Sequence, residues 1–375
     1  MKTFTFYTLI LLIWTLQSCD FNKQSTPYQF PDIWYYPDEL NIPSDNPTTV
    51  EGVELGRYLF YDGRLSGRTD PDSLMSCATC HLQRNGFDTG FDHPKFKNGK
   101  PVGLKHIPTH HYTLPLVNLV YNSNAYFWSG YINSHNIDSS FNLSPTFQNT
   151  NIESVVRLTI LDPAEIAGTP EKTVAAIKND PRYPAMFKQA FGSEEINMDR
   201  IAKAIAQFVR SIISNNSKYH KVLAKEATFT ESEKRGMELF YSEKADCFHC
   251  HGGFLLTSNE FFNNAKDSLF TDRMDHFGVS RDSMDIGAFK APSLINVELT
   301  GPYMHDGRFK TLEEVIDFYS EGLVNSEYAH PLMKQVAKGG VHLTDAEKVD
   351  LLAFLKTFTD HKLLTDPKFG RPEDL

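Results

Sequence analysis

The chain has 375 residues, 41% of them hydrophobic and 13% aromatic, so it can bury a large core and form more than one domain. Its formal net charge of −10 argues against a nucleic-acid partner, which needs a basic surface. An acidic surface of this size is compatible with docking of a basic electron-donor protein.

The first residues have the pattern of an export signal. Lys2 precedes an apolar run over residues 4–16, and the small residue Ser18 stands directly before Cys19. We predict a signal peptide over residues 1–18, since the apolar run is too short to span a membrane. The end of this segment resembles a bacterial lipoprotein signal, which makes Cys19 a candidate for lipidation. An ordinary signal peptide with an incidental cysteine is the alternative.

Residues 19–48 are rich in Pro, Asn, Ser and Asp, and they predict a lipid-anchored tether. Its later part carries Trp34, Tyr35 and Tyr36, which we expect to pack onto the body of the protein. Over residues 49–61 apolar side chains recur at helical spacing, so a helix is expected there.

The pattern Cys-x-x-Cys-His occurs twice, and this pattern attaches a c-type haem. The two thiols bind the porphyrin covalently, and the following histidine is placed to bind the iron. A zinc ribbon or a redox-active thiol pair is the alternative, but neither explains a histidine after each pair. We therefore predict two covalent c-type haems. The two copies are Cys77-Ala78-Thr79-Cys80-His81 and Cys247-Phe248-His249-Cys250-His251.

The cysteine count supports this assignment. The chain has five cysteines. Four are assigned to haem and Cys19 to lipid, which leaves none for a disulfide although export would permit one. C-type haems are attached outside the cytoplasm. We therefore expect a protein on the periplasmic or outer-envelope face, in contact with the membrane only through its lipid.

Residues 82–150 lack helical periodicity and are rich in His, Asn, Gly and Pro. A loop of this length inside a compact domain usually has a functional role. Four of its histidines are candidates for the far side of the first iron or for the lining of that pocket, although each alone is more commonly a surface residue: His93, His106, His110 and His111.

Helical signals dominate the rest of the chain. Thr169 and Pro170 begin a predicted helix that ends at Lys178, and residues 198–213 carry a regular apolar face. Three capping boxes precede further apolar-periodic runs. They are Thr230-x-x-Glu233, Thr311-x-x-Glu314 and Thr344-x-x-Glu347. No sustained alternation predicts a substantial sheet, so the fold is expected to be mainly α.

The haem motifs divide this helical chain. We expect two cytochrome c-like domains, each with one covalently bound haem, over residues 49–213 and 230–364. The polar stretch 214–229 is the predicted linker, and residues 365–375 are a predicted polar tail. Return of the C-terminal segment to the first domain is left open.

An ordered series of short segments adds to the haem motifs. The series comprises Leu55 to Ser66, Ser76 to His81, Phe127 to Gly130, Asp162 to Ile166, Ala291 to Leu294 and Leu299 to Gly307. It resembles the bacterial di-haem cytochrome c peroxidase family, which includes the MauG type. The likeness covers about residues 50–360.

The resemblance implies different roles for the two haems. The haem on His81 would react with hydrogen peroxide, and the haem on His251 would receive electrons from a small cytochrome or copper protein. Glu165 falls at the family's catalytic carboxylate, which moves a proton between the peroxide oxygens. Trp128 matches the tryptophan between the haems. From composition alone, Glu165 would be a surface residue and Trp128 a core aromatic.

The resemblance also implies metal ligands. The family's calcium ion would be held by Asn118, Thr300 and Pro302, since amide and carbonyl oxygens suit a hard cation. His93 matches by position the ligand that is displaced on activation.

The far-side ligand of the second haem is a departure from the better-known peroxidase branch. That branch has a methionine there, whereas this chain has Tyr319, as the MauG type does. A tyrosinate ligand would lower the potential of the haem and favour higher oxidation states of iron. Met304 is the alternative ligand.

Two arginines expected from the resemblance are also missing. Ile295 takes the place of one, and Tyr112-Thr113-Leu114-Pro115 replaces the other. These changes remove expected contacts to the haem propionates.

Three functions are compatible with these features. The first is an exported peroxidase that reduces hydrogen peroxide with electrons from a small cytochrome or copper protein. The second is a MauG-like oxidase that acts on a partner protein, and the third is a non-catalytic di-haem electron carrier. We favour the first and leave open whether the protein is a monomer or a homodimer.

Overall fold

The computed structural model describes residues 25–90, 93, 96–97, 99–122, 124–133, 151–270 and 274–375. The predicted signal peptide and the candidate lipidation site Cys19 lie outside the described residues. In the described part of the chain, no helix is both long and apolar enough to cross a bilayer.

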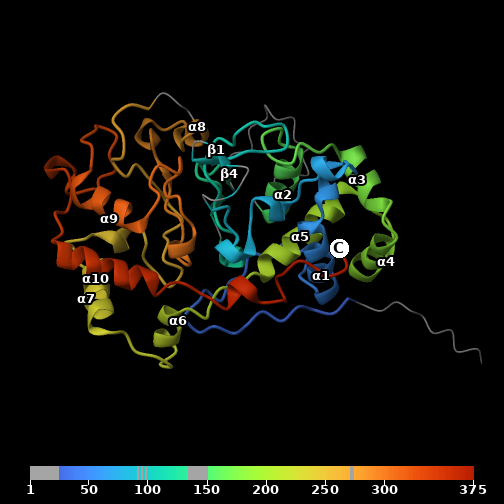
Figure 1. Cartoon of the computed structure of the whole chain (residues 1–375), viewed down its shortest axis with the longest axis horizontal. Helices are drawn as coiled ribbons and strands as arrows, with labels where there is room; N and C mark the ends of the chain where they lie inside the picture. Colours follow the sequence, from blue (N-terminus) through green and yellow to red (C-terminus); the bar gives the residue numbers. More distant parts are fainter. Residues whose placement is uncertain are drawn as a thin grey trace, which may run out of the picture.

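The helices gather in two lobes (Figure 1). One lobe contains α1 (Val50–Tyr61), α2 (Ile152–Leu161), α3 (Pro170–Lys178), α4 (Arg182–Phe191) and α5 (Met198–Ser211). The other contains α7 (Glu231–Phe240), α8 (Phe277–Ser280), α9 (Leu312–Glu321) and α10 (Asp345–Lys356). The short helix α6 (Lys218–Leu223) lies on the stretch between them. We call these the first and second lobes.

The strands of the described residues are two residues long and form antiparallel pairs. They are β1 (Phe96–Lys97) with β2 (Lys100–Pro101), β3 (Ala125–Tyr126) with β4 (Ile132–Asn133), and β5 (Phe261–Phe262) with β6 (Phe289–Lys290). The prediction of a mainly α fold is therefore confirmed.

The helix starts follow the capping residues of the sequence. Thr49 and Thr169 each accept a hydrogen bond from the first turn of α1 and α3, and the predicted boxes at Thr230 and Thr344 both close. The third predicted capping box forms only one of its two hydrogen bonds. Thr311 caps α9, but the carboxylate of Glu314 accepts the main-chain N–H of Lys310 instead of that of Thr311.

The two lobes pack their main helix pairs in the same way. In the first lobe, a Cβ on Gly56 of α1 would lie 1.9 Å from the carbonyl oxygen of Ala204 in α5. In the second lobe, a Cβ on Gly236 of α7 would lie 2.0 Å from the carbonyl oxygen of Asp350 in α10. Only glycine permits such close helix contact, so each lobe has a tightly packed pair beside its Cys-x-x-Cys-His segment.

Aromatic rings fill the core next to both pairs. Phe60 and Phe208 lie 5.2 Å apart between α1 and α5, and Phe240 and Phe354 lie 5.6 Å apart between α7 and α10. Such edge-to-face pairs add to the stabilisation that comes from burial.

Segments distant in sequence tie the lobes together. Tyr36 from the N-terminal segment is buried and donates a hydrogen bond to the carbonyl oxygen of Ser214, 2.7 Å away, on the predicted linker. The C-terminal end lies beside α1 (Figure 1), where the carbonyl oxygen of Phe369 accepts a hydrogen bond from Tyr61 at 2.7 Å. The predicted polar tail thus includes a buried phenylalanine that packs on the first lobe.

Candidate functional site

Both Cys-x-x-Cys-His segments form a single 3₁₀ turn. The turns span Cys77–Thr79 and Cys247–His249. In each, the main-chain N–H of the final histidine donates to the carbonyl oxygen of the first cysteine, over 2.9 Å for His81 and 3.0 Å for His251. Among the described residues, the four cysteines of these turns form no disulfide. The sequence pattern therefore becomes one compact turn that carries two thiols and an imidazole.

The imidazoles are oriented as iron ligands would be. Nδ1 of His81 lies 2.9 Å from the carbonyl oxygen of Phe87, and Nδ1 of His251 lies 3.1 Å from that of Pro292. Burial lowers the pKa of both histidines to about 4, so the rings are neutral and donate from Nδ1. Each Nε2 then keeps its lone pair for a metal, held by the kind of hydrogen bond that orients ligating histidines.

A zinc site at these thiols is not supported. In the described ranges, the one group of three potential ligand residues within 4.8 Å of each other is Glu243, Asp246 and His249, which contains no thiol. The donor set at each turn, two thiols and one oriented imidazole, fits a covalent haem.

Glu165 lies in a tight turn that follows α2. Asp162 ends that helix, and its carbonyl oxygen accepts the main-chain N–H of Glu165 at 3.0 Å. The loop before β3 packs closely here, because a Cβ on Gly103 would lie 2.1 Å from the carbonyl oxygen of Ala164. Leu104 adds a main-chain hydrogen bond to the carbonyl oxygen of Glu165 at 2.9 Å. Backbone contacts thus fix where this side chain begins.

The carboxyl of Glu165 sits beside the first thiol pair. Burial, with a smaller contribution from the charge of Asp162, raises the pKa of Glu165 to about 8. After burial, the charge of Glu165 also raises the pKa of the Cys77 thiol, so the carboxyl acts electrostatically on the first thiol pair. Among the described residues, no hydrogen-bond donor is paired with this carboxyl. It is therefore able to exchange a proton near neutral pH.

Trp128 is buried where the lobes meet. Its indole N–H donates to the carbonyl oxygen of Tyr112 at 2.9 Å, and its own carbonyl oxygen accepts the N–H of Lys290 at 2.8 Å. The indole ring lies 6.4 Å from the ring of His305. Tyr112 also bonds to the second lobe, since its main-chain N–H donates to the carbonyl oxygen of His305 at 2.7 Å. Trp128 is thus held by both lobes.

The structure brings Tyr319 and Met304 to one place. The side-chain amide of Asn264 donates to the hydroxyl of Tyr319 at 3.1 Å and lies 3.6 Å from the sulfur of Met304. Burial raises the pKa of Tyr319, and nearby Cys250 and Cys247 add smaller contributions. Both candidate ligands therefore lie beside the amide of Asn264 in the second lobe, and the thiols of Cys247 and Cys250 act electrostatically on Tyr319.

The candidate histidines of the long loop differ in position. His106 and His110 are exposed, as expected of surface residues, and His93 is partly exposed. His111 lies at the junction of the lobes, 5.4 Å from the ring of Phe289.

The predicted calcium ligands have other partners. The side-chain oxygen of Asn118 accepts the N–H of Ser214 at 2.9 Å, and its amide donates to the carbonyl oxygen of Ser214 at 3.1 Å. The hydroxyl of Thr300 donates to the carbonyl oxygen of Val297 at 3.4 Å, and Pro302 follows a cis peptide bond. Calcium binding by Asn118, Thr300 and Pro302 stays a prediction.

The positions of the missing arginines are filled by uncharged side chains. Ile295 is fully buried, and Tyr112 is 4% exposed between the lobes. The sequence did not mark Tyr112 as functional, although its departure from the expected motif was a signal. Asn264 and Asp88, which also lie in this region, stand in no motif that could have identified them.

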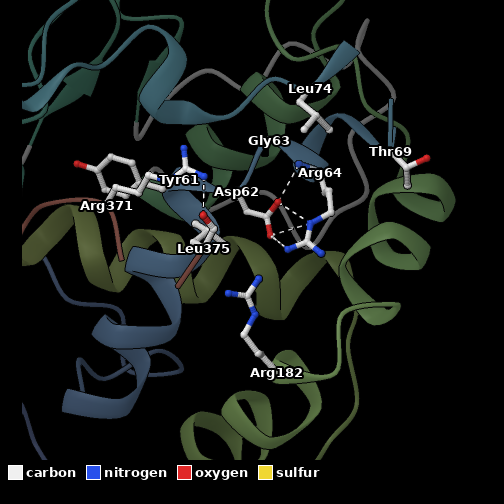
Figure 2. Close-up of a pocket in the computed structure, with 9 residues that line it drawn as sticks. All are labelled: Tyr61, Asp62, Gly63, Arg64, Thr69, Leu74, Arg182, Arg371 and Leu375. Carbon is white, nitrogen blue, oxygen red and sulfur yellow. Dashed lines mark hydrogen bonds and ion pairs between the residues drawn. The ribbon is translucent and has the colours of Figure 1, made fainter. Parts of the chain in front are cut away.

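A cavity of about 320 Å³ lies away from these residues, on the first lobe (Figure 2). Two of the arginines that line it pair with carboxylates. Arg64 binds Asp62 and Asp180, and Arg182 also binds Asp180, each across 2.6 to 2.7 Å. This network joins α4 to the end of α1 and has a structural role. A second cavity, of about 200 Å³, lies between the lobes and includes Asn264, Phe289 and His305 in its lining.

Comparisons with known proteins agree on one family. The family model described as di-haem cytochrome c peroxidase matches residues 50–228. The methylamine utilization protein MauG of Methylorubrum extorquens is 31% identical over 323 residues, which cover 86% of this chain and 82% of that protein. The cytochrome-c peroxidase IdrP1 of a Pseudomonas species is 30% identical over 350 residues, 85% of this chain and 83% of that one.

Solved structures give the same result. A MauG-like protein described as associated with microbial copper homeostasis has a TM-score of 0.78 and 32% identity, over 92% of this chain and 99% of its own. The di-haem peroxidase BthA of Burkholderia thailandensis has a TM-score of 0.66 at 18% identity, over 87% of this chain and 91% of its own, and shares the fold.

Proposed function

The chain belongs to the family of di-haem cytochrome c peroxidases and MauG proteins, and from this premise we propose that it reduces hydrogen peroxide to water with electrons from a small cytochrome or copper protein. The observation that supports this most is Glu165. A recessed carboxyl without a hydrogen-bond partner among the described residues acts electrostatically on the first thiol pair, whereas the second pair acts on Tyr319, which shares the amide of Asn264 with Met304.

Each lobe would hold one covalent haem. Cys77, Cys80 and His81 would bind the first, and the second would be bound by Cys247, Cys250 and His251. Bound there, the haems supply iron that binds peroxide and passes electrons. Tyr319, with Met304 as the alternative, would fill the far side of the second iron. The proposal also includes a calcium ion at the junction of the lobes, which is predicted from the family.

The protein's own side chains would carry the proton and the electrons. Glu165 takes a proton from the entering peroxide oxygen and returns it to the departing oxygen, and a pKa of about 8 permits both transfers near neutral pH. Trp128, held by both lobes, provides the aromatic path between the two sites.

Export follows from the sequence features. Cleavage after residue 18 and lipidation of Cys19 would place the protein on the periplasmic or outer-envelope face. Growth in labelled palmitate followed by gel detection tests the lipid, with Cys19→Ser as the control that should lose the label.

A MauG-like oxidase is the second candidate. Tyr319, beside the second thiol pair, and 31% identity to MauG favour it. Such an enzyme would oxidise side chains of a partner protein instead of a small donor.

Spectra and turnover of the oxidised holoprotein separate these functions. A peroxidase should show a high-spin haem and sustain peroxide turnover with reduced cytochrome c. A long-lived oxidised state that small donors do not reduce would favour the MauG-like oxidase. Two low-spin, six-coordinate haems that are unaffected by peroxide would leave a non-catalytic electron carrier.

A further inference from the structure

Tyr112 and Asp88 form a buried pair that the proposed function does not use. Tyr112 is 4% exposed and Asp88 is fully buried. The phenol donates a hydrogen bond to Oδ1 of Asp88, while Oδ2 of Asp88 has no partner in the part of the chain that the structure describes. No lysine or arginine of the described residues forms an ion pair with this carboxyl, so its neighbours are a phenol and main-chain amides.

This pair stands on a continuous path between two groups of the proposed site. On one side, the indole N–H of Trp128 donates to the carbonyl oxygen of Tyr112 at 2.9 Å. On the other, Asp88 follows Phe87, whose carbonyl oxygen accepts the hydrogen bond from Nδ1 of His81 at 2.9 Å. Covalent bonds and hydrogen bonds therefore run from the junction of the lobes through the Tyr112 ring to the first haem ligand.

A second tyrosine–aspartate pair in the first lobe offers a contrast. Tyr183 donates to Oδ2 of Asp62 at 2.6 Å, and its side chain is also fully buried. Both oxygens of Asp62, however, accept hydrogen bonds from the guanidinium of Arg64, at 2.6 and 2.8 Å (Figure 2). Within the described ranges, the carboxyl next to Tyr112 has no such cation, so once ionised it is able to take up a proton.

This difference matters for oxidation of the phenol. A phenol that loses an electron becomes strongly acidic, so a buried tyrosine is oxidised readily only if a hydrogen-bonded base accepts its proton. Burial raises the pKa of Asp88 to about 8, so its carboxylate, which predominates above that pH, is a stronger base than that of an ordinary aspartate.

We infer that Tyr112 and Asp88 are a redox relay between Trp128 and the His81 site, an inference that rests on the proposed function. The oxidant is hydrogen peroxide, which takes up two electrons and two protons to give two waters; Tyr112 would supply one electron, the His251 site the other, and solvent the two protons. Tyr112 gives one electron toward the His81 site and its phenolic proton to Asp88, leaving a neutral tyrosyl radical and a neutral carboxylic acid. An electron from the donor protein, by way of Trp128, and return of the same proton restore the pair.

The test uses electron paramagnetic resonance of the holoprotein, mixed with hydrogen peroxide in the absence of donor at a pH above the pKa of Asp88, and frozen. The expected radical has a hyperfine pattern that narrows when the protein is made with ring-deuterated tyrosine. Tyr112→Phe should abolish it, and Tyr183→Phe, the matched control, should leave it unchanged. Asp88→Asn keeps the phenol and the side-chain volume but removes the base, so the radical yield should fall.

Optical spectra recorded in parallel separate failure of the relay from failure of the proposed function. If peroxide does not change the haem absorption, the proposed function fails and the relay fails with it. If the absorption changes but the radical is insensitive to deuterated tyrosine or persists in Tyr112→Phe, the relay is overturned and the peroxidase stands. Should Tyr112→Phe not fold, the labelled unsubstituted protein and Asp88→Asn decide the matter.

Discussion

The two lobes share a backbone plan and differ in the side chains that face their thiol turns. Both place a glycine-tight helix pair beside a 3₁₀ turn and orient the histidine through a main-chain carbonyl. In the first lobe the recessed carboxyl of Glu165 acts on a thiol of the turn, while in the second the thiols act on Tyr319, which lies with Met304 beside Asn264. Under the proposed function, the same scaffold would support proton transfer in one lobe and an electron-transfer site in the other, because Glu165 comes from the turn after α2 and Tyr319 from α9, outside the shared helix pairs.

Glu165→Gln gives the largest expected effect on this difference. Loss of a general acid–base group should lower peroxide turnover by about 10²- to 10⁴-fold, while both haems remain attached. Glu171→Gln, on the exposed first turn of α3, is the control and should keep full activity. Steady-state oxidation of reduced cytochrome c measures both. Equal rates for the two variants would remove the chemical distinction between the lobes.

The change of the peroxide reaction rate with pH should be nearly as large as the loss of turnover in Glu165→Gln. The carboxyl must be ionised to accept the first proton, so below its pKa of about 8 the rate constant kcat/KM should rise about tenfold per pH unit. Between about pH 6 and pH 8 the rate therefore increases, and above that range it levels off. Glu165→Gln should flatten this profile. A flat profile in the unsubstituted protein would contradict the assignment.

The shared plan itself is tested by paired glycine substitutions. Gly56→Ala and Gly236→Ala each place a methyl group against a helix carbonyl, and each should destabilise the fold by about 1–3 kcal/mol. Urea unfolding followed by circular dichroism measures both. Gly192→Ala, where no atom lies within 4 Å, controls for the change of residue, although its positive φ adds a small strain of its own. A cost in only one lobe would show that the helix pairs are not equivalent.

The smallest effect is expected from substitutions of Tyr319 and Met304, the candidate ligands of the second haem. Tyr319→Phe removes a hydrogen bond with Asn264, worth about 0.5–1.5 kcal/mol, and should change the spectrum of the second haem alone. Met304→Leu is the matched variant. If Met304→Leu changes that spectrum and Tyr319→Phe does not, Met304 is the ligand, and the second lobe resembles the better-known peroxidases.

Much of the local structure could be predicted because it depends on bonds between near neighbours. The caps at Thr49, Thr169, Thr230 and Thr344 each bond within three residues, so the helix starts were predictable from spacing. The exception, Glu314, failed because the main-chain N–H of Lys310 competed for its carboxylate.

The functional site likewise has features that depend on short motifs and features that depend on tertiary contacts. The sequence by itself determined the two haem-attachment turns, the mainly helical fold and the family, since these depend on short motifs and their order. Only the tertiary structure decided that Glu165 is recessed beside Cys77, that Phe369 is buried on α1, and that Asp88 meets Tyr112. Burial and pKa are set by residues far away in the chain, and no local pattern records which of them will surround a given carboxyl.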